Sequence, residues 1–501
     1  MSRAPRTSGH TPVLGRDGAL ALGASAVEAA LAAGVLEAEA VIMTEDSGLA
    51  RYAGDRVHQH VSERNCEIRV RAVRGRRVAV TAGNQADTDS VRAVAERAAA
   101  AAGRSPEDPY FPGLPHPSST PYVDQTTFYA STAELEPADR AEAVRIILGL
   151  LKSAGAQGFG AVTSAVTELA VVNSHGVHAY QSFTDAWVSV IAQRERYPAG
   201  EGAAVQTLTT SGRAGGAAAP SSRAPLRPAT GRATACHRDW SEIDPESTAL
   251  RALSKASLET PRHLPPGEYT VLLEETAVAE MLEFLAYGAL NGLNFLEGQS
   301  LYSGRLGERP YPATITLRDD PTDARATNFS FDFEGVPKAP LTLIRGGVLE
   351  RVAWDSATAA RGGEASTGHA LPAPNPHGPM PLNLTLLPGS HDRAELLAKM
   401  DRGLLVTRFH YVNEVDPART LLTGMTRDGT FLVEDGKIVA PVQDLRWVES
   451  IDGVLKRTIA VGSTQQLVSE GPGYGMRSLV GSLMPALLVE GFSITGSADP
   501  D

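Results

Sequence analysis

The chain has 501 residues, of which 42% are hydrophobic and 21% charged, and its formal net charge is −12. This length predicts two or three folding units with ordinary cores, and the acidic balance argues against direct nucleic-acid binding, because that binding depends on basic residues that neutralise phosphates. The two cysteines, Cys66 and Cys236, are too few for a disulfide scaffold or a cysteine-based zinc cluster.

The first residues of the sequence do not predict a targeting signal. The first 20 residues are polar and lack the apolar stretch of a signal peptide. No run approaches the roughly 18 apolar residues that a membrane span requires. We therefore expect a cytoplasmic protein without a membrane partner, in which residues 1–18 form a flexible tail.

Residues 19–197 predict an N-terminal α+β domain. A helix is expected at about 20–33, and alternating runs between 38 and 83, such as Glu67–Val73, indicate an antiparallel meander with one wet face. Two helices and three strand-like runs follow, at about 88–102, 137–154, 169–173, 177–181 and 186–192. This succession is typical of helices packed on one side of an antiparallel sheet.

Residues 198–234 interrupt the pattern. They are rich in glycine, alanine, serine, threonine and proline and contain almost no large apolar side chains. Such a segment cannot bury enough surface to offset the roughly 1–2 kcal/mol of backbone entropy that each ordered residue loses. The composition predicts a mobile loop or linker.

Residues 235–501 predict a β-rich C-terminal domain. A strand is expected at 269–273 and an amphipathic helix at about 276–291, whose apolar stripe favours a core position. Short strands with glycine-containing turns then dominate, which predicts a closed or barrel-like sheet. These strands are expected at 313–317, 341–344, 349–354, 382–387, 404–412, 421–425, 430–433, 437–440, 455–460 and 486–494.

Several blocks of this domain resemble the TldD/PmbA peptidase family. The run Gly403–Val412, followed by Val415-Asp416-Pro417, is similar to the family block GLYVTRLWYV…DP, and Leu422–Ile438 is similar to TGxTRDGTFLIENGEI. Shorter matches occur at Ser366–His369 and Arg446–Ser450. The N-terminal meander also fits the family, so the resemblance covers nearly the whole chain apart from the tail and the predicted linker.

The resemblance also identifies a degenerate metal motif. In the family's catalytic TldD-type subunit, a helix carries HExxxH, in which two imidazoles bind zinc and the glutamate activates water. The two histidine positions fall at Glu283 and Gly288, and the glutamate position falls at Phe284. The family's cysteine ligand near the C-terminus has no counterpart after Cys236. We therefore expect neither a metal site nor a catalytic residue in this chain.

The resemblance implies a non-catalytic TldE-type (PmbA-type) subunit in a heterodimer with a TldD-type catalytic subunit. Zinc is expected in that partner and no cofactor in this chain. The pair would degrade or process unfolded or modified peptides, with secondary metabolism as one setting. One alternative is a self-sufficient family hydrolase with a non-standard metal site, and another is a regulatory binding protein, as the family's older name, modulator of gyrase, suggests.

Four polar residues are candidates for substrate or partner contact. Arg408 and His410 share one face of an extended segment, and such residues can hold a peptide carboxylate or carbonyl. Asn413 follows on the same segment, and His369 belongs to the Ser-Thr-Gly-His block. A structural hydrogen-bond network is the alternative for all four. A further acidic group lacks the spacing of a calcium loop and predicts a solvated loop: Asp319, Asp320, Asp323, Asp332 and Glu334.

Overall fold

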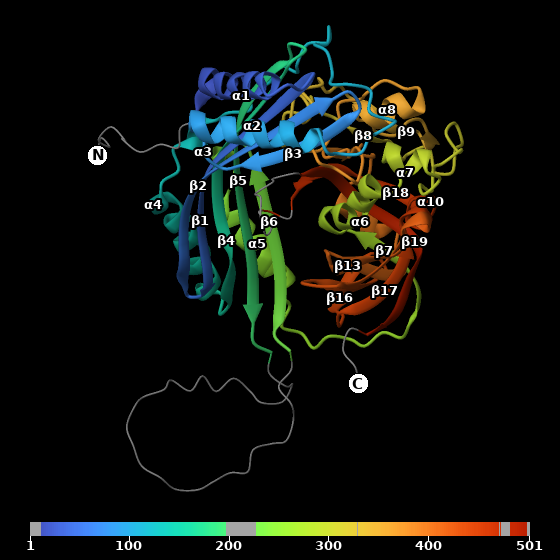
Figure 1. Ribbon diagram of the computed structural model, residues 1–501. Helices are drawn as coiled ribbons and strands as arrows, with labels where there is room; N and C mark the ends of the chain where they lie inside the picture. Colours follow the sequence, from blue (N-terminus) through green and yellow to red (C-terminus); the bar gives the residue numbers. More distant parts are fainter. Residues whose placement is uncertain (1–11, 197–226, 328, 470, 472–480, 498–501) are drawn as a thin grey trace, which may run out of the picture.

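The computed structural model describes residues 12–196, 227–327, 329–469, 471 and 481–497. It contains a six-stranded sheet in the first half of the chain and a 13-stranded sheet in the second half. Figure 1 shows the two sheets side by side, each with its own helices. The predicted α+β class is confirmed, and no helix among the described residues is long and apolar enough to span a membrane.

The first sheet is antiparallel throughout and has the strand order β3-β2-β1-β4-β5-β6. Its strands are mostly long: β1, for example, continues through the polar or small residues Asp46, Ser47 and Gly48 without a break. The strands are β1 (Glu37–Gly54), β2 (Arg56–Arg74), β3 (Arg77–Gly83), β4 (Gln157–Asn173), β5 (His178–Arg194) and β6 (Ala229–His237).

Four helices cover one face of this sheet: α1 (Gly15–Ala32), α2 (Thr88–Ala102), α4 (Pro137–Ser153) and α5 (Pro245–Lys255). The even-numbered residues of β1 point to these helices, so Ile42 packs beneath α1 and α2, and Tyr52 packs beneath α4. The odd-numbered residues point to the opposite face, where Val41 packs against Phe331 of the second half. The short helix α3 (Ala130–Ala133) and the 3-10 helix η1 (Trp240–Glu242) complete this half.

Two expected boundaries differ from the structure. The predicted linker 198–234 lies mostly outside the described residues, but its last residues belong to β6, and α5 packs on β6. Small residues such as Gly231 allow this close approach, because a side chain there would overlap the backbone of α5. Because β6 consists mostly of small residues, it lacks the alternation of large apolar and polar side chains by which a strand is recognised in a sequence. Helix α1 also begins at Gly15, inside the predicted tail of residues 1–18.

The second sheet is not closed into a barrel, which corrects the expected barrel-like arrangement. Its main path runs β10-β9-β8-β11-β19-β7-β12-β15-β16, and the described residues of β10 and β16 at its two ends do not pair with each other. A branch of β17, β14 and β13 leaves the path at β19. The long strand β19 (Ser482–Ser497) is the common neighbour of β7, β11, β17 and β18.

The other elements of this half are mostly short. The strands are β7 (Gly267–Leu273), β8 (Leu317–Asp319), β9 (Leu341–Arg345), β10 (Val348–Leu349), β11 (Leu384–Leu386), β12 (Arg402–Val406), β13 (Phe409–Asp416), β14 (Leu421–Thr426), β15 (Thr430–Glu434), β16 (Lys437–Pro441), β17 (Leu445–Ser450) and β18 (Thr458–Val468). The helices are α6 (Glu275–Tyr287), α7 (Gly292–Leu296), α8 (Ser356–Gly362), α9 (Arg393–Ala398), η2 (Pro417–Arg419) and α10 (Ile451–Lys456).

The close packing of α4 on β1 gives a first testable prediction. Arg140 of α4 is 0% exposed and lies over Gly48, where an added Cβ would overlap the guanidinium group. We expect Gly48→Ala to lower the free energy of unfolding by about 1–3 kcal/mol, because the side chain and the helix must shift. Urea denaturation measures this change. The control is Gly149→Ala in α4, where a Cβ would meet open space. This variant should be neutral or stabilising by up to about 1 kcal/mol. Equal stabilities of the two variants would contradict the predicted overlap.

Candidate functional site

Helix α6 follows β7 directly and carries the positions of the degenerate motif. Its apolar residues, among them Val278, Met281 and Leu285, are buried in the main core of the second half. The helix ends at Tyr287, and Gly288 is its C-terminal cap. The predicted core helix is therefore present, but it stops before residue 291.

The three motif positions line two neighbouring hollows. Glu283 is half-buried and, with Glu280, lines a cavity of about 420 Å³ whose other walls come from the segments around Leu382 and Val468. Phe284 and Gly288 line a second hollow of about 420 Å³. Tyr287 borders both. Among the described residues, there is no group of three or more histidine, cysteine or acidic side chains that could hold a metal ion.

Arg408 connects α6 to the strands beside it. Its guanidinium lies 3.3 Å from the Glu280 carboxylate (Nη2–Oε1) and 3.3 Å from the Asp428 carboxylate (Nη1–Oδ2). Its Nε donates a hydrogen bond to the Phe409 carbonyl oxygen. Glu280 also accepts a hydrogen bond from the Phe409 N–H. The Arg408 side chain is only 12% exposed. Its guanidinium, which the sequence predicted as a candidate for substrate contact, is therefore bound mainly to these protein groups.

His410 and Asn413 lie further along β13, where the pairing with β14 is irregular. His410 is half-buried, and burial together with the charges of Arg427 and Arg408 lowers its pKa, which favours the neutral ring. Asn413 is exposed, and its side-chain amide donates to the Tyr411 carbonyl oxygen at 2.8 Å. Tyr411 has a positive φ of 56° and is 74% exposed. The structure thus places these residues near Arg408 but turns Asn413 towards solvent.

His369 is held elsewhere, in a buried ionic cluster. Its Nδ1 lies 2.9 Å from the Thr367 hydroxyl, and its Nε2 lies 3.4 Å from Oδ1 of Asp319. Lys338 Nζ lies 3.4 Å from the same Asp319 oxygen, and all three ionisable side chains are at most 3% exposed. Burial, followed by the charge of Lys338, lowers the pKa of His369. This arrangement fits the structural alternative for His369 better than substrate contact.

The acidic group around Asp319 does not form a solvated loop, so that expectation is wrong. Asp319, Asp320, Asp332 and Glu334 are all buried. Burial and the neighbouring Glu334 carboxylate raise the pKa of Asp332 to about 8. Asp332 accepts hydrogen bonds from the Glu334 and Ala370 N–H groups, and Asp320 pairs with the nearby Arg318. Glu334 faces Arg71 of β2. The contacts made by Ala370 and Arg71 join distant segments, which a local pattern does not reveal.

The basic run of β2 provides one of those side chains. Arg71 lies 3.1 Å from Glu334 of the second half and 2.8 Å from Glu39 of β1. The Arg71 side chain is only 11% exposed, so the predicted wet face of Glu67–Val73 is partly an interface between the two halves. Arg69 likewise donates a hydrogen bond to the Ala373 carbonyl oxygen.

Sequence reasoning missed the acidic partners of Arg408. Glu280 lies among apolar residues of α6, and an acid within such a stripe is a signal that a buried cation lies nearby. Asp428 stands between β14 and β15, with a positive φ of 55°. No local signal links these two residues to Arg408, because the contact between Glu280 and Arg408 spans 128 positions.

Comparisons with known proteins match this architecture. Residues 266–496 match the family model described as the PmbA/TldA metallopeptidase C-terminal domain. A metalloprotease from Methanothermobacter thermautotrophicus is 28% identical over 208 residues, which cover 40% of this chain and 44% of that protein. A metalloprotease TldD homolog from Haemophilus influenzae is 28% identical over 222 residues, which cover 43% and 45%. The chain thus matches less than half the length of these curated relatives.

The fold extends the similarity to the whole chain. The crystal structure of TldE from Thermococcus kodakarensis matches with a TM-score of 0.79 and 19% sequence identity, covering 95% of this chain and 100% of that chain. At this level of identity the likeness concerns the fold. It includes the six-stranded sheet, which lies outside the matched family model.

Proposed function

Because residues 266–496 place this chain in the TldD/PmbA family, we propose that it is the non-catalytic TldE-type subunit of a heterodimeric TldD/TldE zinc metallopeptidase. In this proposal the pair degrades or processes unfolded or modified peptides. A TldD-type partner supplies the zinc, and this chain supplies part of the wall that contacts the peptide. The observation that carries the proposal is the composition of α6 and its C-terminal cap, which present Glu283, Phe284 and Gly288 at the motif positions.

These residues do not fit a zinc site. Zinc is held by several nitrogen, sulfur or oxygen ligands in a defined geometry, and the three motif positions provide one carboxylate, one phenyl ring and bare backbone. The neighbouring Glu280 carboxylate faces Arg408 and the Phe409 N–H. In this proposal, zinc and its activated water come from the partner.

Co-expression with a TldD-type protein tests the proposal. We expect a 1:1 complex by native mass spectrometry, zinc bound through the partner's HExxxH motif, and cleavage of unfolded peptides that stops when the metal is chelated. Glu283→Gln in this chain should retain peptide cleavage within about tenfold, because no catalytic step is assigned to it. Loss of the partner's motif should abolish cleavage.

The alternatives predict different outcomes. Stoichiometric zinc on the isolated chain, together with chelator-sensitive cleavage, would establish a self-sufficient hydrolase and overturn the proposal. A pull-down that retrieves gyrase and no TldD-type protein would instead support a regulatory binding protein. The isolated chain is the control for the co-expressed complex.

A further inference from the structure

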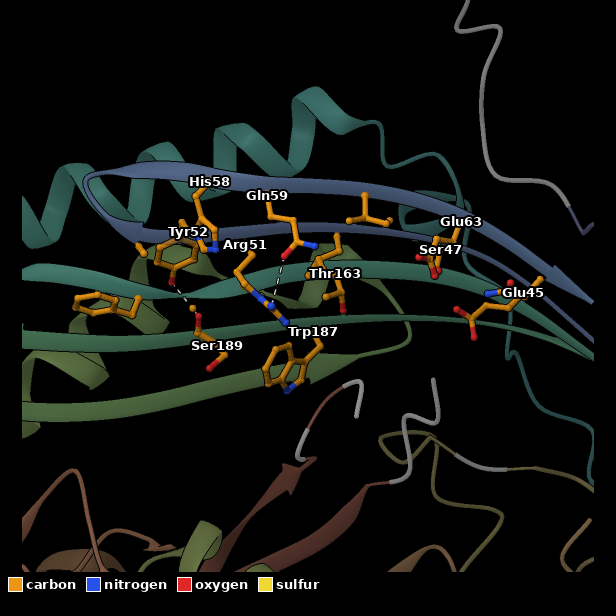
Figure 2. Close-up of a pocket in the computed structure, with 18 of the residues that line it drawn as sticks. Glu45, Ser47, Arg51, Tyr52, His58, Gln59, Glu63, Thr163, Trp187 and Ser189 are labelled. Atoms are coloured by element: carbon orange, nitrogen blue, oxygen red, sulfur yellow. Dashed lines mark hydrogen bonds between the residues drawn. The ribbon is translucent and has the colours of Figure 1, made fainter. Parts of the chain in front are cut away.

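The face of the first sheet opposite its helices contains a large cavity. This cavity has a volume of about 830 Å³ and is formed by residues of β1, β2, β4 and β5. Its volume is in the range of about 300–1,000 Å³ that is usual for ligand sites. Figure 2 shows the lining side chains along the sheet, with His58 and Tyr52 towards one end, Arg51 and Trp187 next to them, and Glu45 and Glu63 towards the other end.

The strand register fixes this order. Arg51 pairs with Gln59 of β2 and with Ala161 of β4, whereas Ser47 pairs with Glu63. The four steps along the strand from Ser47 to Arg51 span about 13 Å at the usual rise of ~3.3 Å per residue. Within the cavity, Arg51 and Glu63 are therefore separated by about the length of a short extended peptide segment, and these two positions are called its charged ends below.

The two ends carry opposite charges. Arg51 is exposed, and its guanidinium makes one long hydrogen bond, 3.4 Å, to the Gln59 side-chain oxygen. Within the described part of the chain, Arg51 has no carboxylate partner, and Glu63 has no basic partner. Glu45 lines the cavity on the same side as Glu63. A guanidinium that faces a cavity without a counter-charge is suited to hold a carboxylate.

The side chains that form the floor between the charged ends are small or medium-sized and uncharged. It includes Ser47, Leu49, Ala161 and Thr163. The backbone groups of β1 and β4 are already paired within the sheet. A ligand here lies on the face of the sheet and does not extend the sheet as a new strand, so side chains determine its recognition.

We propose that this face binds an extended peptide whose C-terminal carboxylate lies at Arg51 and whose lysine or arginine side chain lies at Glu63 and Glu45. The inference rests on the proposed peptide-processing function and adds the class of peptide to it. The separation of the charges assigns the basic residue to a position about four to six residues before the C-terminus. Opposite charges at the two ends also orient the peptide.

Peptide binding to the isolated full-length chain tests this inference without any hydrolysis. The probe is an N-terminally labelled octapeptide with a free C-terminal carboxylate and a lysine four residues before it, and the readout is fluorescence anisotropy. We expect about tenfold weaker binding of the C-terminally amidated peptide, as for the loss of one charge-assisted contact. Arg51→Gln should weaken binding of the free acid to the level of the amide and leave binding of the amide unchanged.

Matched variants separate charge recognition from folding. Arg92→Gln, an exposed arginine of α2 on the helix-covered side, should bind both peptides as the wild type does. Glu63→Gln should remove the preference for lysine over norleucine at the basic position. Thermal unfolding should be the same for all these variants, since Arg51, Glu63 and Arg92 are exposed.

Three outcomes would overturn the inference: equal binding of acid and amide to the wild-type chain, an equal loss of both peptides in Arg51→Gln, or rescue of the amide by an internal aspartate far from its C-terminus. Repeating the measurement on the chelated complex with a TldD-type partner separates the two proposals. If no such complex forms but the isolated chain discriminates acid from amide, the proposed function fails and the binding site stands. If the zinc-loaded complex cleaves peptides but the chelated complex and the isolated chain bind acid and amide equally, the proposed function stands and the binding site fails.

Discussion

Replacing Arg408 with methionine is expected to lower the free energy of unfolding by about 3–5 kcal/mol, because two buried carboxylates lose their shared cation. Glu280 and Asp428 are 7% and 5% exposed in their side chains, and each lies 3.3 Å from the guanidinium. Because both side chains are largely buried, water compensates for the lost charge only in part. Urea denaturation followed by circular dichroism measures the loss.

Two further variants identify the cause. In the double variant Arg408→Met/Glu280→Gln, part of the lost stability should return, because one of the uncompensated charges is removed. Arg402→Met serves as the matched control on β12, since its side chain is 65% exposed and its ion pair with Glu434 is 3.6 Å long. Its effect should stay below about 1 kcal/mol. A similar small effect at Arg408 would show that the two acids do not depend on this cation.

The second large effect is expected at Lys338, whose replacement by methionine should also remove about 3–5 kcal/mol at neutral pH. Lys338 and Asp319 are 3% and 0% exposed, with 3.4 Å between Nζ and Oδ1. Adding Asp319→Asn to this variant should restore part of the stability, because the buried negative charge disappears. Lys437→Met, at an exposed position of β16, is the control and should be nearly neutral.

Acidification distinguishes this effect from a simple packing loss. Burial raises the pKa of Asp319, but Lys338, His369 and the Asn383 N–H outweigh burial and hold it well below its usual range. A depressed pKa means that the stabilisation is present above the unfolded value of about 3.9 and is lost as the pH falls below it. Without Lys338 the pKa of Asp319 rises, so the difference from wild type should shrink between pH 7 and pH 5. A difference independent of pH would indicate a packing effect.

Several elements of the fold were predictable because local periodicity and tertiary packing agree. The helices expected at 88–102 and 137–154 are α2 and α4, and the turn around Asn173 and Ser174 joins β4 to β5. The strand lengths were not predictable, because polar residues such as Asp46 and Ser47 continue β1 through pairing with distant strands. The run 455–460 is partly helix, since α10 ends at Lys456.

The candidate site was predictable only in part. The sequence places Arg408 and His410 on one extended segment, and β13 does begin between them at Phe409. It cannot show that Arg408 turns aside to Glu280 and Asp428, because these contacts join segments far apart in the chain. The same reason explains His369, whose environment depends on Asp319 and Lys338. Charge partners at long range decide whether a polar residue faces a ligand or the core.

The position of β19 has a consequence for how the second half assembles. Strand β7 pairs with β19, which lies more than 200 positions later in the chain. Strands β11, β17 and β18 also pair with β19. Non-local pairing of this kind slows folding. A nascent polypeptide that has emerged only as far as β18 exposes several unpaired strand edges at once, and such edges are prone to aggregation. Chaperone demand during synthesis should therefore be concentrated in this half, while the first sheet can form earlier.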